Sequence, residues 1–175
     1  MSAQVELERH RRRGAIAARL LDTAPDAAAA LDWDALDRAP AWLAIPDTEL
    51  ALEQRRIGAV LRAAAIRLWI DRRRLAAART AVGDDFLRVL LADCAAPETS
   101  PASVPGTDGG SDVAEWLRQA GAAVQAAAIS DSPLGHAAAI GLCGRDGGAQ
   151  PLEAGAARGL IERAKRIGAT LGPNV

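Results

Sequence analysis

The chain has 175 residues, of which 50% are hydrophobic, and a formal net charge of −1 with a pI near 6.1. This length suits one domain, or one domain with an appended subdomain. The near-neutral charge argues against a whole-molecule attraction to nucleic acid or acidic lipid. Ala and Leu, both good helix formers, dominate the apolar residues, whereas aromatic residues make up only 3%. We therefore predict an all-α fold, a compact domain of about seven to nine helices with a flexible central loop.

The N-terminal part of the sequence predicts a long helix followed by short helical pieces. The first helix covers residues 3–22, and its polar middle, Arg9–Arg13, predicts an exposed segment. A short helix is expected over 27–31, because Pro25 suits a first turn, and a further turn over 32–38. The segment Pro40–Pro46 holds three large apolar residues between two prolines, which indicates a helical turn wedged into the core.

The central part of the sequence predicts the strongest helix, capped by Asp47, with apolar residues at helical spacing. The pattern continues to Ile70, where four large apolar residues in five positions exceed one helix face. That stretch is therefore expected to be buried on several sides or kinked. Asp71 predicts the cap of a helix over 72–82, Gly83 its end, and Asp84 the cap of the next helix.

Residues 95–111 interrupt the helical pattern. Three Pro, three Gly and small polar residues cannot offset the entropy of ordering, so this segment is predicted to be a flexible linker or loop. It divides the chain into an N-terminal helical part, 1–94, and a C-terminal helical part, 112–175, which we expect to pack together as one domain. Within the second part, helices are predicted over 112–128, from Ser132 to about Leu142, and over 152–171, with a turn over 144–148.

The sequence contains no recognisable catalytic, metal-binding or cofactor-binding motif. Cys94 and Cys143 belong to no metal-ligand spacing, and His10 lies in a charged stretch. His136 lies seven residues before Cys143, about 10 Å along a helix, which is too far for direct contact. The glycine-rich run 141–148 matches neither the P-loop nor the dinucleotide fingerprint. A small enzyme using Cys143 or His136 is nevertheless kept as one alternative.

Two basic runs could contact an acidic partner. Arg9–Arg13 and Arg72–Arg74 could each grip phosphates, although a solvated helix face explains both. Arg72, Arg73 and Arg74 begin a predicted helix, where positive charge opposes the helix dipole. Three arginines in a first helical turn are unfavourable for the helix itself. We therefore hypothesise that they form a surface for an acidic partner.

The stretch from Pro40 to Leu91 resembles the SctK family of type III secretion, called YscK, OrgA or MxiK in different systems. It carries a Pro-x-Trp-Leu turn at Pro40–Leu43, a Leu/Ala-rich helix, an Ile70-Asp71 step, and a helix ending at Gly83 before another apolar helix. The similarity covers about a third of the chain and is a pattern of apolar residues.

This resemblance implies a non-enzymatic adaptor without cofactor or small-molecule substrate. SctK-like proteins belong to the cytoplasmic sorting platform and link the SctD ring domain to the SctQ pods. The expected location is therefore the cytoplasm, at the cytoplasmic face of the inner membrane, with no direct membrane insertion and no nucleic acid. The sequence start lacks the apolar run of a secretory signal, which agrees with that location. A nucleic-acid-binding helical regulator and a type III secretion chaperone stay open as alternatives.

Tryptophan dominates interface hot spots, so Trp42 and Trp69 are natural anchors for a partner if they are exposed. Burial in the core is the competing interpretation for both. The candidate partner-binding residues are Trp42, Trp69, Arg72, Arg73 and Arg74.

Overall fold

The computed structural model describes residues 3–25, 32–93, 111–132, 134–143 and 152–172. Within these ranges the chain forms nine α-helices, one 3-10 turn and no strand, which confirms the predicted all-α class. The elements are α1 (Ala3–Thr23), α3 (Trp33–Arg38), the 3-10 turn η1 (Ala41–Ala44), α4 (Asp47–Leu61), α5 (Ala63–Arg67), α6 (Arg72–Val82), α7 (Asp84–Ala92), α8 (Ser111–Ala128), α9 (Gly135–Cys143) and α10 (Ala154–Thr170).

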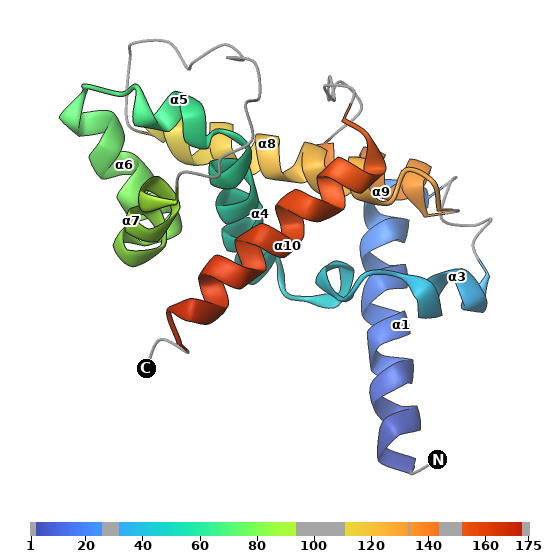
Figure 1. Ribbon diagram of the computed structural model, residues 1–175. Coiled ribbons are helices and arrows are strands. Elements are labelled where there is room, and N and C mark those ends of the chain that lie inside the picture. The colour runs from blue at the N-terminus through green and yellow to red at the C-terminus, as the bar shows by residue number, and fades with distance from the viewer. Residues whose placement is uncertain (1–2, 26–31, 94–110, 133, 144–151, 173–175) are drawn as a thin grey trace.

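Helices α4 and α8 cross at the centre of the molecule and form its most extensive helix–helix contact. Gly58 in α4 and Gly121 in α8 lie at this crossing, where the backbones approach too closely for any side chain. Helix α10 packs across both helices, and α6 and α7 lie on one side of them (Figure 1). On the other side α1 contacts α3, η1 and α9.

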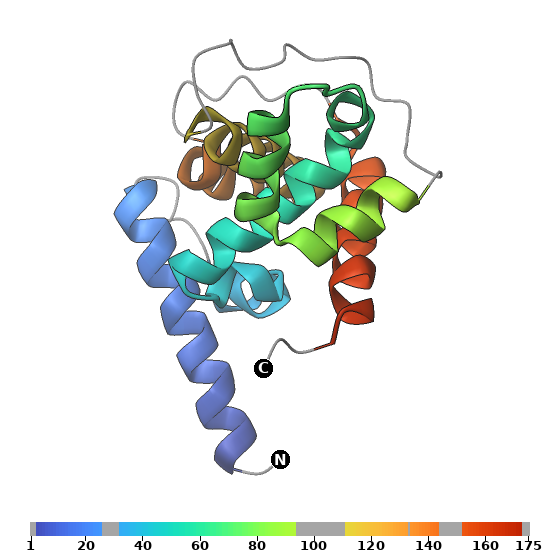
Figure 2. The same ribbon diagram turned by 90° about the vertical axis from the view of Figure 1, so that its left-hand side faces the viewer.

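The N-terminal half of α1 extends away from the other helices (Figures 1 and 2). Residues 3–11 are all exposed, whereas Ile16 and Leu20 in the second half are buried against the body. The predicted helix and the predicted exposure of its polar middle agree with this arrangement, although Arg12 and Arg13 are half-buried.

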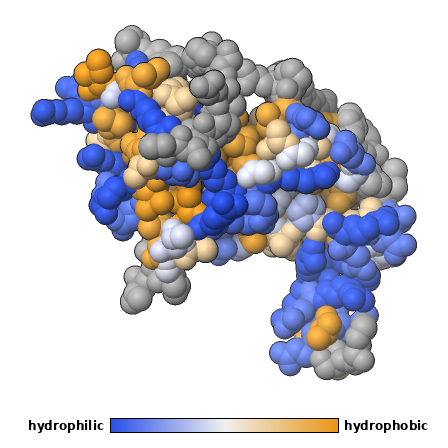
Figure 3. Space-filling model, viewed as in Figure 1, coloured by the Kyte–Doolittle hydropathy of each residue, from blue (hydrophilic) through white to orange (hydrophobic). Residues whose placement is uncertain are grey.

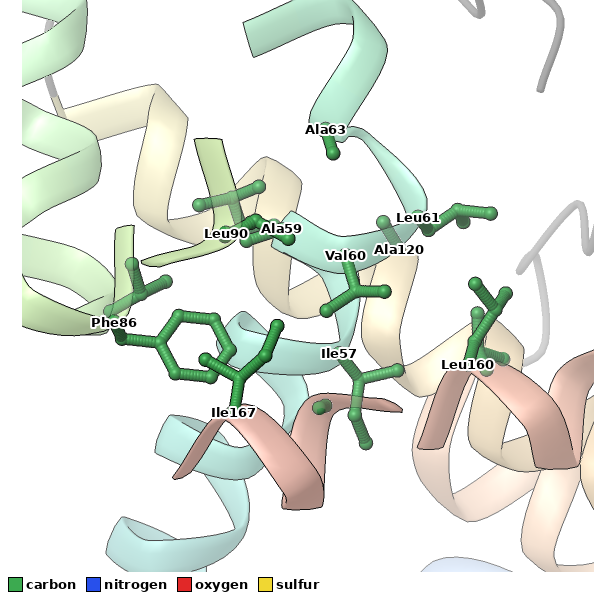
Figure 4. Close-up of a cluster of buried hydrophobic side chains, with 14 of the residues drawn as sticks. Ile57, Ala59, Val60, Leu61, Ala63, Phe86, Leu90, Ala120, Leu160 and Ile167 are labelled. Atoms are coloured by element: carbon green, nitrogen blue, oxygen red, sulfur yellow. The ribbon is translucent and has the colours of Figure 1, made fainter. Parts of the chain in front are cut away.

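Two clusters of buried side chains hold these helices together. The larger one joins α4 to α8, α10 and the α5–α7 region, and Phe86, Ile57, Leu160 and Ile167 converge in it (Figure 4). The smaller one joins α1, α3 and η1 to α8 and α9. Alanine supplies many of the contacts, as the composition led us to expect, and this permits short distances between helices.

Local signals in the sequence place several helix ends correctly. The Asp71 carboxylate accepts a hydrogen bond from the backbone N–H of Arg73 at 2.8 Å, which caps α6 as predicted. Gly83 ends α6 with φ +94°, a conformation that L side chains rarely adopt. The capping assigned to Asp47 and Asp84 is wrong, because each is the first helical residue and the cap position belongs to the residue before it.

The helix breaks at Arg62, before the apolar stretch 66–70 for which a kink or burial on several sides is predicted. Helix α4 ends at Leu61, Arg62 leaves the helical region with ψ +10°, and α5 follows as a single short helix. The predicted burial on several sides is wrong for Leu68 and Ile70, since both are largely exposed.

Several predicted features lie outside the described residues. These are the helix over 27–31, the loop over 95–110 and the turn over 144–148. Helix α9 begins at Gly135, three residues after the predicted start at Ser132. In the described part of the chain, no helix combines the length and apolar character needed to cross a bilayer.

Candidate interaction surface

The most exposed large apolar side chains lie in the connection between α5 and α6. Leu68 and Ile70 are 78% and 94% exposed, far more than Leu21 or Trp33 elsewhere on the described surface. We call the segment Leu68–Arg74 the α5–α6 tip. It lies at one extremity of the molecule in Figure 1, and Figure 3 shows hydrophobic and hydrophilic surface side by side at this end.

Trp69, between the two exposed residues, holds the tip against the body of the protein. Its ring is partly buried and packs on Trp116 of α8, with ring centroids 5.7 Å apart and an interplanar angle of 35°. The Arg62 guanidinium lies 5.4 Å from the centroid of Trp116, on its face. Burial lowers the pKa of Arg62 below its ordinary value. Leu68 and Ile70 are therefore displayed by an anchored loop.

A hollow of about 180 Å³ opens beside the Trp116 ring. Its wall is mainly apolar, and the Nε of Arg62, at its edge, is buried without an acceptor. The buried indole N–H of Trp69 also has no acceptor. The residues that line the hollow are Leu61, Arg62, Trp116, Gln119, Ala120, Ala123, Val124 and Leu152.

The first turn of α6 adds positive charge to the tip. Arg72 and Arg73 are exposed, and neither makes an ion pair with the described residues, whereas Arg74 is half-buried with its Nε 3.7 Å from the Asp71 carboxylate. No acidic side chain lies in this helical turn. Backbone N–H groups at a helix start also carry partial positive charge, so the two exposed guanidinium groups give this end of α6 a positive charge that the Asp71 carboxylate only partly offsets.

Of the residues predicted to bind a partner, the structure brings Trp69, Arg72, Arg73 and Arg74 together at the tip. Trp42 lies apart from them, in the smaller core cluster, and is only 5% exposed. Its role as an exposed anchor does not hold, because the ring is buried in a cluster that includes residues of α8 and α9.

Sequence reasoning missed Leu68, Ile70 and Trp116 as components of this surface. The signal for the first two was present, since four large apolar residues in five positions cannot all face one core. Trp116 could not be placed, because its contact with Trp69 joins segments 47 residues apart along the chain.

Two residues of the first basic run make contacts within the protein. Arg13 forms an ion pair with Asp37 of α3, and Arg12 donates to the backbone carbonyl of Ala39. Arg9 and Arg11 remain exposed on the extended half of α1. The contacts of Arg12 and Arg13 tie α1 to α3.

Of the groups considered for catalysis, the structure describes the side chains of Cys143 and His10, whereas Cys94 and the side chain of His136 lie outside its described part. Cys143 is half-buried, and burial raises its thiol pKa, an effect that Arg118 partly opposes. A raised pKa disfavours the reactive thiolate. His10 is exposed on α1. Across the described ranges, no group of three or more His, Cys, Asp or Glu side chains could hold a metal ion.

Comparison of the chain with protein-family models, with curated proteins and with solved structures gives no match in any of the three.

Proposed function

We propose that this chain is a non-enzymatic adaptor of a bacterial type III secretion system. In this proposal it links an SctD-like domain of the inner-membrane ring to SctQ-like pods, at the cytoplasmic face of the inner membrane. The resemblance of Pro40–Leu91 to the SctK family supports the system, and the α5–α6 tip, which lies inside that stretch, supports protein binding.

The observation that carries the proposal is the exposure of Leu68 and Ile70 on an anchored loop. Fully burying one such side chain contributes about 1.5–3 kcal/mol, so two that stay in water leave a substantial unused contribution to binding. Neighbouring exposed apolar residues rimmed by charge are typical of protein interaction sites. The nearby Trp and Arg side chains belong to the residue types that dominate binding hot spots.

The proposal is tested by affinity purification of the tagged full-length protein from its native bacterium, followed by mass spectrometry. Recovery of the ring's cytoplasmic domain and of the pod subunit is the expected result. Replacing Leu68 and Ile70 by Ser should remove at least one of these partners. Leu21→Ser is the matched control, because Leu21 is 51% exposed on α1 and lies outside the tip.

Recovery of unrelated proteins or of exported substrates, without ring or pod components, would contradict the adaptor proposal. Exported substrates alone would favour a secretion chaperone. If the tip variant recovers the ring and pod proteins as well as the wild type does, the assignment to the secretion system stands, but the binding site is not formed by Leu68 and Ile70.

A further inference from the structure

The α5–α6 tip combines three features that define the chemistry of its occupant: protruding apolar side chains, an apolar hollow beside Trp116, and two exposed guanidinium groups. We propose that the tip binds an acidic segment of a partner protein, one apolar side chain of which enters the hollow while its carboxylates contact Arg72 and Arg73. This inference rests on the proposed function only in treating the chain as a protein-binding module, and it does not depend on the secretion system.

The size of the hollow restricts what can enter it. Pockets for drug-sized ligands and cofactors span about 300–1,000 Å³, whereas this hollow measures about 180 Å³. It therefore suits a single side chain better than a complete small molecule. Its wall is built from Leu61, Val124 and Leu152 around the Trp116 ring, so the matching side chain is apolar.

The hollow and the protruding residues are connected through the contact between two tryptophan rings. Trp116 borders the hollow and also packs on Trp69, which directly joins Leu68 to Ile70. In the proposed complex, the partner segment seated in the hollow also covers Leu68 and Ile70. Burial at both places gives a small knob-and-hole contact of the kind that fixes the orientation of a bound peptide.

The charged side chains at the tip indicate which other residues the partner segment carries. Asp71, the only acidic residue of the tip, already caps α6 through the N–H of Arg73 and lies near Arg74. Arg72 and Arg73 therefore have no carboxylate available within the tip. Arg62 adds a third guanidinium at the edge of the hollow, with one buried N–H lacking an acceptor. Carboxylates flanking an apolar residue complement all three groups.

Other occupants fit these features less well. A bilayer is a soft planar surface that covers protruding residues but cannot place a side chain into the hollow. A second copy of the chain, joined through the same surface by two-fold symmetry, would bring the exposed guanidinium groups of two tips into one interface, where each tip offers only the carboxylate of Asp71. Both occupants are outcomes of the test below.

The test uses the full chain to select binders from a displayed library of random dodecapeptides. Enriched peptides should carry net negative charge and at least one large apolar or aromatic residue. The variant R72E/R73E should bind them at least tenfold more weakly. This variant should remain folded, because both positions are exposed and acidic residues in a first helical turn are favourable. R9E/R11E, an exposed pair on α1, is the matched control and should bind normally.

The binding position is then read from the indole N–H signals of the four tryptophans in the NMR spectrum, assigned by single Trp→Phe variants. An enriched peptide should shift the Trp69 and Trp116 signals and leave Trp33 and Trp42 unchanged. Enrichment of neutral or basic peptides, equal binding by R72E/R73E, or shifts confined to Trp33 and Trp42 would overturn the proposal.

Two further results would also overturn it. One is failure of the library to yield a binder while vesicles containing phosphatidylglycerol shift the Trp69 signal. The other is concentration-dependent self-association that R72E/R73E abolishes. The two proposals can fail separately. If the tip binds acidic peptides but the chain purifies without ring or pod proteins, the proposed binding of an acidic segment is kept and the type III secretion proposal is rejected.

Discussion

Gly121 of α8 lies directly against the backbone carbonyl of Gln54 in α4. A methyl group on Gly121 would lie 1.8 Å from that oxygen, and one on Gly58 would lie 1.9 Å from the carbonyl oxygen of Leu117. The two glycines thus form a reciprocal contact in which each helix meets the backbone of the other. This contact sets the spacing of the central pair on which the other helices pack.

Replacing Gly121 by Ala should therefore destabilise the protein by about 3 kcal/mol or more, because the clash involves backbone atoms that cannot rotate away. Chemical denaturation monitored by circular dichroism measures the effect. Gly159→Ala is the control, since Gly159 is exposed within α10 and a methyl group there would have no neighbouring atom within 4 Å. That substitution should stabilise the protein by about 0.5–1 kcal/mol through its effect on the unfolded chain. A Gly121→Ala protein as stable as the wild type would mean that α4 and α8 are further apart than described.

A buried amide pair lies beside the glycine contact. The Nε2 of Gln54 donates to the Oε1 of Gln125 at 3.2 Å, and the two residues are 3% and 0% exposed. Gln125→Leu should cost about 1–3 kcal/mol, because it leaves the Gln54 amide buried without its acceptor. The double variant Q54L/Q125L should recover most of that loss, since both polar groups are then removed. Equal destabilisation in the single and double variants would show that packing, not the hydrogen bond, decides the effect.

The helices were predictable because short-range physics determines them. Asp71 before Arg72 and Gly83 after Val82 are local signals, and both act as expected. The crossing of α4 and α8 was not predictable in this way. Gly58 and Gly121 each lie inside a helical pattern, where a glycine by itself only weakens the helix. The reason for glycine at these positions is the close approach of α4 and α8, which the sequence does not show.

Only part of the candidate surface was predictable, for a related reason. The excess of apolar residues around Trp69 indicated that not all of these side chains could be buried in the core. The sequence does not identify which of them are exposed. In the structure α5 ends at Arg67, and in the non-helical segment that follows, Leu68 and Ile70 are exposed while Trp69 packs on Trp116. The helix dipole argument for Arg72 and Arg73 depended only on adjacent residues, and the exposed positions of both side chains agree with it.

The half-buried Glu53 of α4 gives the protein a specific pH dependence. Burial raises the pKa of this carboxyl above its ordinary value, and the charge of Lys165 partly opposes the shift. Because the pKa of Glu53 is higher in the folded than in the unfolded state, protonated Glu53 contributes fully to the free energy of unfolding at pH values below its pKa in the unfolded chain. This contribution is lost as the pH rises through the folded pKa.

Glu53→Gln should therefore be more stable than the wild type at pH 7, and this advantage should disappear as the pH falls to about 4. Thermal unfolding at a series of pH values measures the difference. Glu8→Gln, at an exposed position on α1, controls for the loss of one negative charge and should change stability by less than about 0.5 kcal/mol. An advantage of Glu53→Gln that is the same at both pH values would assign the effect to packing.

The tip separates residues that stabilise the fold from residues that are free to bind. The double variant L68S/I70S should change the free energy of unfolding by no more than about 0.5 kcal/mol per site, because both side chains are already in water. Trp69→Ala should cost about 1–3 kcal/mol, since it removes the packing on Trp116 and uncovers part of the larger core cluster. Urea denaturation of the three proteins compares these effects. If L68S/I70S were as destabilising as Trp69→Ala, the two exposed residues would have to contribute to the folded monomer. Their exposure could then no longer serve as evidence for a partner.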